Sequence, residues 1–206
     1  ARYAADGGLV NQGISAELIA EKWKISREDM DRYGVRSQSY AARATQEGRF
    51  QNEIIPTLDA EGKIMTTDEG IRESTLEKLA TLKPAYRPIE DGGKVTAGNS
   101  SQITDGATAV LIMSEERAKQ LGLKPRARFV NFALAAENPR YMLTAPIPAT
   151  KKVLERAGLK MSDIDLVEIN EAFASVVLAW EKELHPDMEK VNVNGGAIAL
   201  GHPLGA

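Results

Sequence analysis

The hydrophobic positions in the first part of the chain recur at helical spacing and predict a long amphipathic helix behind Ser26. Asp29 lies three residues after Ser26, a spacing that is typical of a capping box at a helix start. Gly48 is expected to end this helix, because glycine readily adopts the conformation that follows a last helical turn. The positions that would form the inner face are Met30, Tyr33, Tyr40, Ala41 and Ala44.

Shorter elements are predicted around this helix. Ser15 begins one short helix, and Ser74 opens another that stops before Pro84. Residues 53–56 predict a short edge strand, because the proline that ends them cannot donate a hydrogen bond to a neighbouring strand. Residues 1–90 are therefore expected to be polar, rich in loops and mostly helical.

From Val95 onward, short apolar runs alternate with helical patterns. The helical patterns lie behind Ser114, between Pro148 and Gly158, and over residues 171–184. This alternation predicts right-handed βαβ units and a buried, mainly parallel or mixed sheet, so we expect an α/β fold for the second half. The predicted strands are residues 107–113, 128–136, 165–169 and 191–193.

The composition is that of an ordinary globular protein. Of the 206 residues, 43% are hydrophobic and 27% are charged, and the formal net charge is −3. Such a chain lacks the clustered positive field that holds nucleic acids or anionic membranes. No stretch approaches the roughly 20 apolar residues that span a bilayer. We therefore expect no nucleic-acid or membrane partner and, since no targeting leader is visible, a cytoplasmic location.

The chain has no cysteine and only two histidines, His185 and His202. Disulfides, thiolate metal sites and a thiol nucleophile are excluded for these residues, and two histidines are too few for most zinc sites. We therefore expect no metal site. The last residues lie inside a glycine-rich stretch, an unusual place for a natural protein to end, and we interpret the chain as an internal fragment of a longer protein.

The glycine-rich run from Gly195 to Pro203 follows a predicted strand and carries His202. Its glycines resemble those of a phosphate-binding loop, but His202 and Pro203 stand where such a loop needs Lys and Ser or Thr. The spacing also differs from that of a dinucleotide-binding fingerprint. A structural turn and a turn whose glycines let a ligand approach His202 are both compatible with this pattern.

Other polar positions also allow a structural and a functional interpretation. Asn170 and Glu171 could cap and begin a helix, or Asn170 could point into a ligand crevice at the carboxyl end of a strand. Ser100 and Ser101 could form a plain turn, or a hydroxyl there could meet a ligand amide. His185 is expected to be solvated.

Taken together, several segments resemble the thiolase family in their order and separation. NEAFA at residues 170–174 and NVNGGAIALGHP at residues 192–203 carry most of the resemblance, and VTAGNSS at 95–101 and PIPA at 146–149 match further thiolase segments. The similarity extends over essentially the whole chain. It implies an α/β, thiolase-like fold with a mixed sheet, covering helices and an inserted, mostly helical loop domain, truncated at both ends in this chain.

The resemblance also implies how the chain is divided. Residues 1–103 match most of the loop domain, residues 104–124 match the end of the N-terminal thiolase half, and residues 125–206 match the beginning of the C-terminal half. The family's two cysteines, one the nucleophile and one an acid/base residue, would lie before and after this chain.

The function implied by the family is that of an acyl-CoA C-acyltransferase. It would cleave 3-ketoacyl-CoA with CoA, or condense acyl-CoAs, through a cysteine acyl-enzyme. His202 matches the histidine that makes the thiolate, a role suited to a side chain that exchanges protons near neutral pH. Asn170 matches the residue that holds a water beside the enolate oxygen. Coenzyme A is a substrate of this reaction, and no cofactor is expected.

Further residues match positions that contact coenzyme A or the acyl group. Those along the pantetheine arm are Ser101, Ala172 and Phe173, and those near the adenine end and the arm are Arg72 and Tyr86. Gln12 stands where many thiolases carry a methionine, so it is expected to alter the wall that meets the acyl chain. The pattern is most similar to bacterial thiolases that act on bulky, even steroid-derived, acyl-CoAs.

Two other functions share features with this interpretation. One is a thiolase-like module that binds CoA or lipid, or serves in assembly, without thiolysis. The other is a condensing enzyme of fatty-acid or polyketide synthesis, a class whose typical motifs differ from NEAFA and from the GHP at residues 201–203. Cysteines in the complete gene would favour the acyltransferase of fatty-acid β-oxidation and lipid metabolism, which we expect to form a homodimer or homotetramer.

Overall fold

The computed structural model describes residues 3–4 and 7–204 and is mainly helical. Its helices and strands are α1 (Gln12–Lys22), α2 (Arg27–Gln46), β1 (Thr57–Leu58), β2 (Ile64–Met65), α3 (Leu76–Ala80), α4 (Glu115–Gln120), α5 (Pro146–Ala157), α6 (Ala174–Leu184) and α7 (Ala197–Leu200). Short 3-10 helices cover Ile89–Asp91, Pro139–Thr144, Met161–Asp163 and Met188–Lys190.

The capping box predicted at the start of α2 is confirmed. The Ser26 hydroxyl accepts a hydrogen bond from the backbone N–H of Asp29 at 3.0 Å, and the Asp29 carboxylate accepts one from the N–H of Ser26 at 2.9 Å. These contacts satisfy N–H groups that have no partner inside the helix. The helix ends at Gln46, and Gly48 has a positive φ of 71°.

The other helix ends follow the sequence less closely. Ser114 caps α4, and Gly158 ends α5 in a left-handed conformation, as predicted. The short helix predicted behind Ser15 is present as α1, but its predicted start was wrong, because Asn11 provides the cap and Ser15 is buried inside the helix. Thr75, one residue after the predicted Ser74, caps α3.

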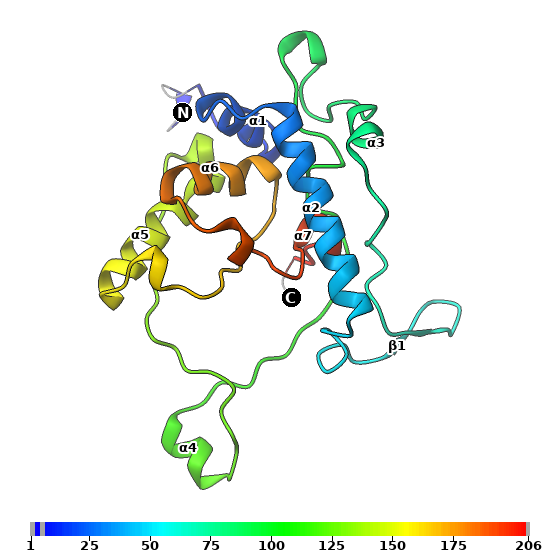
Figure 1. The fold of residues 1–206 in the computed structure, drawn as a ribbon. Coiled ribbons are helices and arrows are strands. Elements are labelled where there is room, and N and C mark those ends of the chain that lie inside the picture. Colours follow the sequence, from blue (N-terminus) through cyan, green and yellow to red (C-terminus); the bar gives the residue numbers. More distant parts are fainter. Residues whose placement is uncertain (1–2, 5–6, 205–206) are drawn as a thin grey trace.

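The core lies where α1, α2 and α6 meet, with the 3-10 helix Pro139–Thr144 packed against α1 and α6 (Figure 1). Ile19, Met30, Val177 and Ile198 are at most 1% exposed and belong to one apolar cluster. A second cluster, around Trp180, joins α6 to α5. We call this unit, formed by α1, α2, α5, α6, α7 and the segments that join them in the core, the helical body.

The mixed sheet predicted for the second half is absent from the residues that the structure describes. Among residues 7–204, the two strands that pair over consecutive residues are β1 and β2, which form an antiparallel hairpin just after the predicted strand 53–56. Val167 and Val191, each in a predicted strand, form an isolated parallel bridge. The chain path therefore brings these two segments together without building a sheet.

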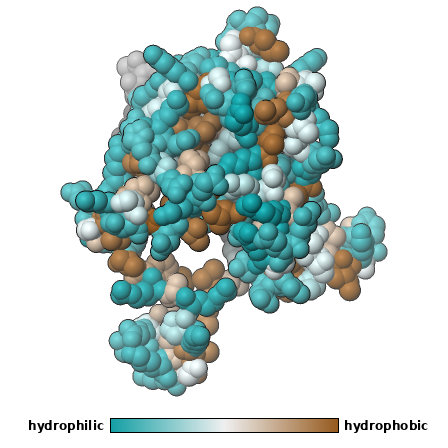
Figure 2. Space-filling model, in the orientation of Figure 1, coloured by the Kyte–Doolittle hydropathy of each residue, from teal (hydrophilic) through white to brown (hydrophobic). Residues whose placement is uncertain are grey.

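The predicted strands 107–113 and 128–136 lie in the part of the chain that leaves the helical body and carries α4 (Figure 1). We call residues 103–136 the extension. Its apolar side chains are exposed, with Leu111 at 78% and Phe132 at 77%, and Figure 2 shows apolar groups on the surface of this region. A strand exists only beside a second strand that is hydrogen-bonded to it, and these two segments pair with no strand among the described residues.

No helix within the described part of the chain is both long and apolar enough to span a membrane.

Candidate functional site

His202 lies at the end of the glycine-rich turn, just after α7, and is exposed. Its backbone N–H donates to the carbonyl of Gln102 at 3.2 Å, and the Gln102 N–H donates to the carbonyl of Ala197 at the same distance. Gly201, at a φ of 91°, supplies a backbone conformation that other residues rarely adopt. The turn is therefore fastened to the segment that begins at Ser101.

Asn170 is exposed and comes directly before the buried Glu171. The interpretation of this pair as a helix cap was wrong, as was the predicted helix start at residue 171. The helix α6 begins at Ala174, and its N-cap position is Phe173, which makes no side-chain cap hydrogen bond. Asn170 and Glu171 therefore do not cap α6.

The carboxylate of Glu171 is fully buried and accepts hydrogen bonds from separate parts of the chain. Two hydroxyls on α2 donate to it: Tyr33 Oη lies 2.8 Å from Oε1, and Ser37 Oγ lies 2.6 Å from Oε2. Asn192 Nδ2 donates to Oε1 at 2.9 Å, and the Ile198 N–H donates to Oε2 at 3.1 Å. We call this group the Glu171 cluster.

Desolvation and the charge of Glu171 shift the pKa values of two nearby side chains. Burial, the Glu171 charge and the hydrogen bond to it raise the pKa of Tyr33, so its hydroxyl stays protonated. Partial desolvation first, and the Glu171 charge second, raise the pKa of Glu168. The cluster is therefore a local centre of negative charge, offset by hydrogen bonds.

Most residues predicted to meet coenzyme A gather at one place. The Ser101 N–H donates to the carbonyl of Ala172 at 3.0 Å, and the preceding Ser100 bridges to Phe173. The Tyr86 ring packs edge-on against the Phe173 ring, with their centroids 6.0 Å apart. The Ser100 hydroxyl is buried and donates to the Thr96 carbonyl, so its role is structural.

Gln12 is connected to this group through Gly13, and Arg72 is connected to the glycine-rich turn through Gln38. Gln12 is exposed at the start of α1, and the next residue, Gly13, packs against the Tyr86 ring so closely that a Cβ atom there would lie 2.2 Å from it. The Arg72 N–H donates to Gln38 Oε1 at 2.9 Å, and Gln38 Nε2 donates to the Ile198 carbonyl at 3.1 Å.

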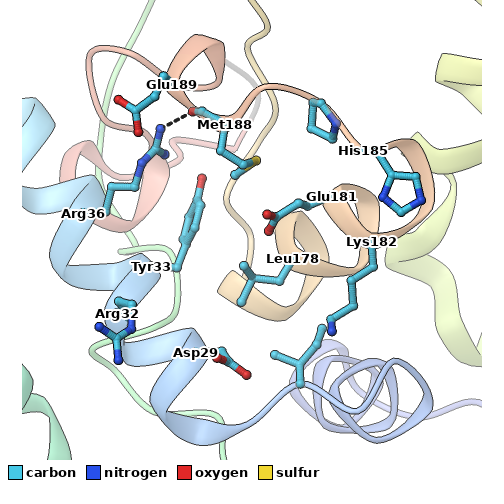
Figure 3. Close-up of a pocket in the computed structure, with 12 residues that line it drawn as sticks. Asp29, Arg32, Tyr33, Arg36, Leu178, Glu181, Lys182, His185, Met188 and Glu189 are labelled. Carbon is cyan, nitrogen blue, oxygen red and sulfur yellow. Dashed lines mark hydrogen bonds between the residues drawn. The ribbon is translucent and has the colours of Figure 1, made fainter.

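A cavity of about 700 Å³ lies between α2 and α6 (Figure 3). Its walls mix charges of both signs, and Arg36 crosses one side to donate to the Met188 carbonyl. His185 lines it and is exposed, as predicted. None of the residues matched to thiolase positions lines this cavity, and we assign the site by the hydrogen-bonded motifs instead.

Sequence reasoning missed the residues that fasten the turn. Gln38 and Gln102 both donate to the Ile198 carbonyl, and Tyr33 and Ser37 both donate to Glu171. A signal was available in α2, because Tyr33 and Ser37 are four residues apart and share the helix face that carries its apolar positions. Polar groups on a buried helix face require partners, which points to a polar cluster.

Comparisons with known proteins agree with these motifs. Residues 8–116 match the family model "Thiolase, N-terminal domain", and residues 123–206 match "Thiolase, C-terminal domain". The chain is 54% identical over 197 residues to the steroid 3-ketoacyl-CoA thiolase FadA6 of Mycobacterium tuberculosis, covering 96% of this chain and 47% of that protein. It is 49% identical over 212 residues to an acetyl-CoA acetyltransferase of Syntrophomonas wolfei, covering 97% and 52%.

The fold is also that of solved thiolases. The human mitochondrial 3-ketoacyl-CoA thiolase in complex with CoA matches with a TM-score of 0.91 and 44% identity, over 96% of this chain and 49% of that one. The dimeric peroxisomal thiolase of Saccharomyces cerevisiae matches with a TM-score of 0.90 and 43% identity, over 95% and 50%. This chain thus spans about half the length of the relatives it matches. The chain belongs to the thiolase family.

Proposed function

We propose that this chain is the central part of an acyl-CoA C-acyltransferase that cleaves 3-ketoacyl-CoA with CoA or runs the reverse condensation. One observation carries the proposal. The turn with His202 is hydrogen-bonded to Gln102, next to Ser101, and to Glu171, next to Asn170. The segments that match the family's histidine, asparagine and CoA-arm positions therefore meet at one place. The names of the relatives support the same reaction class.

In this proposal His202 takes the proton from the thiol that becomes the nucleophile, because only a thiolate attacks the keto carbon efficiently. Cleavage of the carbon–carbon bond then leaves an enolate of the acyl-CoA product, with charge on its oxygen. A His202 nitrogen and a water held by Asn170 would donate hydrogen bonds to that oxygen. Each such preorganised donor is worth about 3–4 kcal/mol in comparable oxyanion sites.

The CoA arm would follow Ser101, Ala172 and Phe173, with Tyr86 against the Phe173 ring. Arg72, which is exposed, would contact the adenine end. Gln12 would form part of the wall for the acyl chain, and we propose a bulky, steroid-derived acyl group as the substrate. Support for this comes from the name of the mycobacterial relative.

The nucleophilic and the acid/base cysteines would come from parts of the complete protein outside these 206 residues, which contain no cysteine. Those parts would also supply strand neighbours for residues 107–113 and 128–136. We propose a cytoplasmic homodimer or homotetramer, and the division of the chain at residues 103 and 124 stays a prediction. A CoA- or lipid-binding module without thiolysis is not favoured, because the relatives are named as enzymes.

The test compares the complete protein with this chain alone. The complete protein should cleave acetoacetyl-CoA or a bulkier 3-ketoacyl-CoA with CoA, and the 206-residue chain should show no thiolysis above a blank. Turnover by the pure chain would overturn the mechanism. A complete gene without cysteines at the family positions would replace the acyltransferase with the binding module.

A further inference from the structure

The Glu171 carboxylate joins the two segments that carry the proposed catalytic residues. It lies one residue after Asn170 in sequence and accepts the N–H of Ile198, four residues before His202. The helix α7 is a single turn, Ala197–Leu200, so its first N–H groups have no helical partner of their own. Glu171 therefore supplies an acceptor that the turn itself cannot provide.

The carboxylate also sets the packing of the turn. A Cβ atom on Gly196 would lie 2.4 Å from the Glu171 carboxyl carbon, so the turn backbone rests directly against this group. The Gly196 N–H donates to Ser37 Oγ at 3.2 Å, and that hydroxyl donates in turn to Glu171. Ser37 thus relays a second N–H of the turn to the same carboxylate.

The segment that carries Asn170 is fixed from its other side. The Asn192 side chain accepts from the Ile169 N–H and donates to the Ile169 carbonyl, each at 2.8 Å, while it also donates to Glu171. Asn170 therefore lies between Ile169, whose backbone N–H and carbonyl are both hydrogen-bonded to Asn192, and Glu171, whose carboxylate accepts hydrogen bonds from four donors.

Resting on the function proposed above, we propose that Glu171 is a positioning residue, whose charged carboxylate holds the His202 turn in register with Asn170 and with α2. It acts through hydrogen bonds to the turn and has no contact with substrate in this role. The His202 and Asn170 side chains are exposed, and neither makes a side-chain hydrogen bond among the described residues. The buried Glu171 carboxylate and the Ser37 hydroxyl set their relative position instead, through their hydrogen bonds to the turn.

The role requires a carboxylate, because all the groups facing it are donors. In Glu171→Gln the side-chain amide keeps one oxygen, and its NH2 group must replace the other. If the NH2 group takes the position of Oε2, it faces the Ile198 N–H. If it takes the position of Oε1, it faces the NH2 group of Asn192. Either orientation leaves a buried donor without an acceptor.

The experiment uses the complete protein, the variant Glu171→Gln and one matched pair of variants. Glu171→Gln should lower kcat by about 10- to 100-fold, the scale expected from a small misplacement of a catalytic group, while KM for CoA changes by less than about threefold. Hydrogen exchange of the peptide that covers residues 195–204 should speed up at least about tenfold. A kcat within twofold of wild type with full protection of this peptide would overturn the proposal.

The matched pair removes one hydroxyl donor from each carboxylate oxygen. Ser37→Ala releases the turn at Gly196, whereas Tyr33→Phe removes a donor that has no hydrogen bond to the turn. Ser37→Ala should lower kcat by about 3- to 10-fold and deprotect the turn, and Tyr33→Phe should do neither, although both lower the melting temperature. Equal effects on kcat would show a merely structural cluster and overturn the proposal.

These variants are milder than Glu171→Gln and keep the test decisive if that variant fails to fold. The exchange measurement also separates this proposal from the enzymatic one. A wild-type protein without thiolysis would refute the proposed function, while the exchange comparison of Ser37→Ala with Tyr33→Phe would still decide whether the carboxylate holds the turn.

Discussion

Residues 107–113, with the sequence ATAVLIM, and α6, which begins ASVVLAW, carry similar runs of apolar residues. In α6 the run is buried against α1 and α2, whereas in the extension Val110, Leu111 and Ile112 are 65–78% exposed. The difference lies in the backbone. A helix satisfies its N–H and C=O groups within its own residues, but a strand needs a neighbour. Apolar sequence therefore leads to burial only where the backbone is also satisfied.

The largest difference expected between the helical body and the extension concerns catalysis, because the proposed catalytic residues belong to the helical body. In the complete protein His202→Ala should lower kcat by at least about a thousandfold, since it removes both the base and one enolate donor. CoA affinity should change little, because the side chain would meet the thioester end. Turnover and CoA binding are measured for this variant and for Asn170→Ala, which should cost less because another water can replace the lost one.

Retained turnover in His202→Ala, or a collapse of CoA affinity alone, would make His202 a structural residue of the turn.

A second comparison uses two large aromatic residues in the 206-residue chain. Trp180 in α6 is 2% exposed and donates from Nε1 to Thr150 Oγ1 at 3.0 Å. Trp180→Ala should lower the free energy of unfolding by about 3–5 kcal/mol through the cavity it leaves. Phe132→Ala in the extension should change it by less than about 0.5 kcal/mol, because the ring is already exposed.

Urea denaturation measures both values. Similar losses for the two variants would mean that the extension folds together with the helical body.

A third pair compares two helix caps of the same kind. Ser26→Ala removes the cap of α2 and should cost about 1 kcal/mol of global stability. Ser114→Ala removes the equivalent cap of α4 and should leave the unfolding midpoint unchanged, because α4 lies in the extension. A midpoint shift of equal size in the two variants would contradict this.

The smallest expected effect concerns the pH dependence of stability. Glu168 is exposed, and its partial desolvation, followed by the charge of Glu171, raises its folded-state pKa. Folding therefore favours its protonated form, and this contribution is lost as pH rises from the ordinary carboxyl range through the raised pKa. Glu168→Gln should therefore raise the melting temperature near neutral pH by about 1 °C and have no such effect in acid. Glu116→Gln, in α4, serves as the control and should leave the melting curve unchanged at both pH values.

The sequence predicted helices better than strands, for a physical reason. The capping box at Ser26 and Asp29 is a local device, read from residues three positions apart, and it was correct. The strands 107–113 and 128–136 depend on partners that no local pattern contains. The predicted sheet was therefore wrong for the described residues, although the thiolase fold was right.

The candidate site shows the same division. The family motifs identified the glycine-rich turn and the segment from Asn170 to Phe173, which the structure brings together. Local rules failed at Glu171, because an acidic residue near a helix start is normally explained by the helix dipole. Its partners Tyr33 and Ser37 lie more than a hundred positions away in sequence, so no local rule could pair them.

Those separations have a consequence for the order of folding. Tyr33 and Glu171 are 138 positions apart, and Gln38 and Ile198 are 160 apart, while the backbone of Gly201 packs against Thr104. Contacts that close such long loops form slowly, whereas α2 can nucleate from its own residues. During synthesis the turn also emerges after the segments on which it docks. The region on which the proposed chemistry depends is therefore expected to be among the last to reach its native conformation.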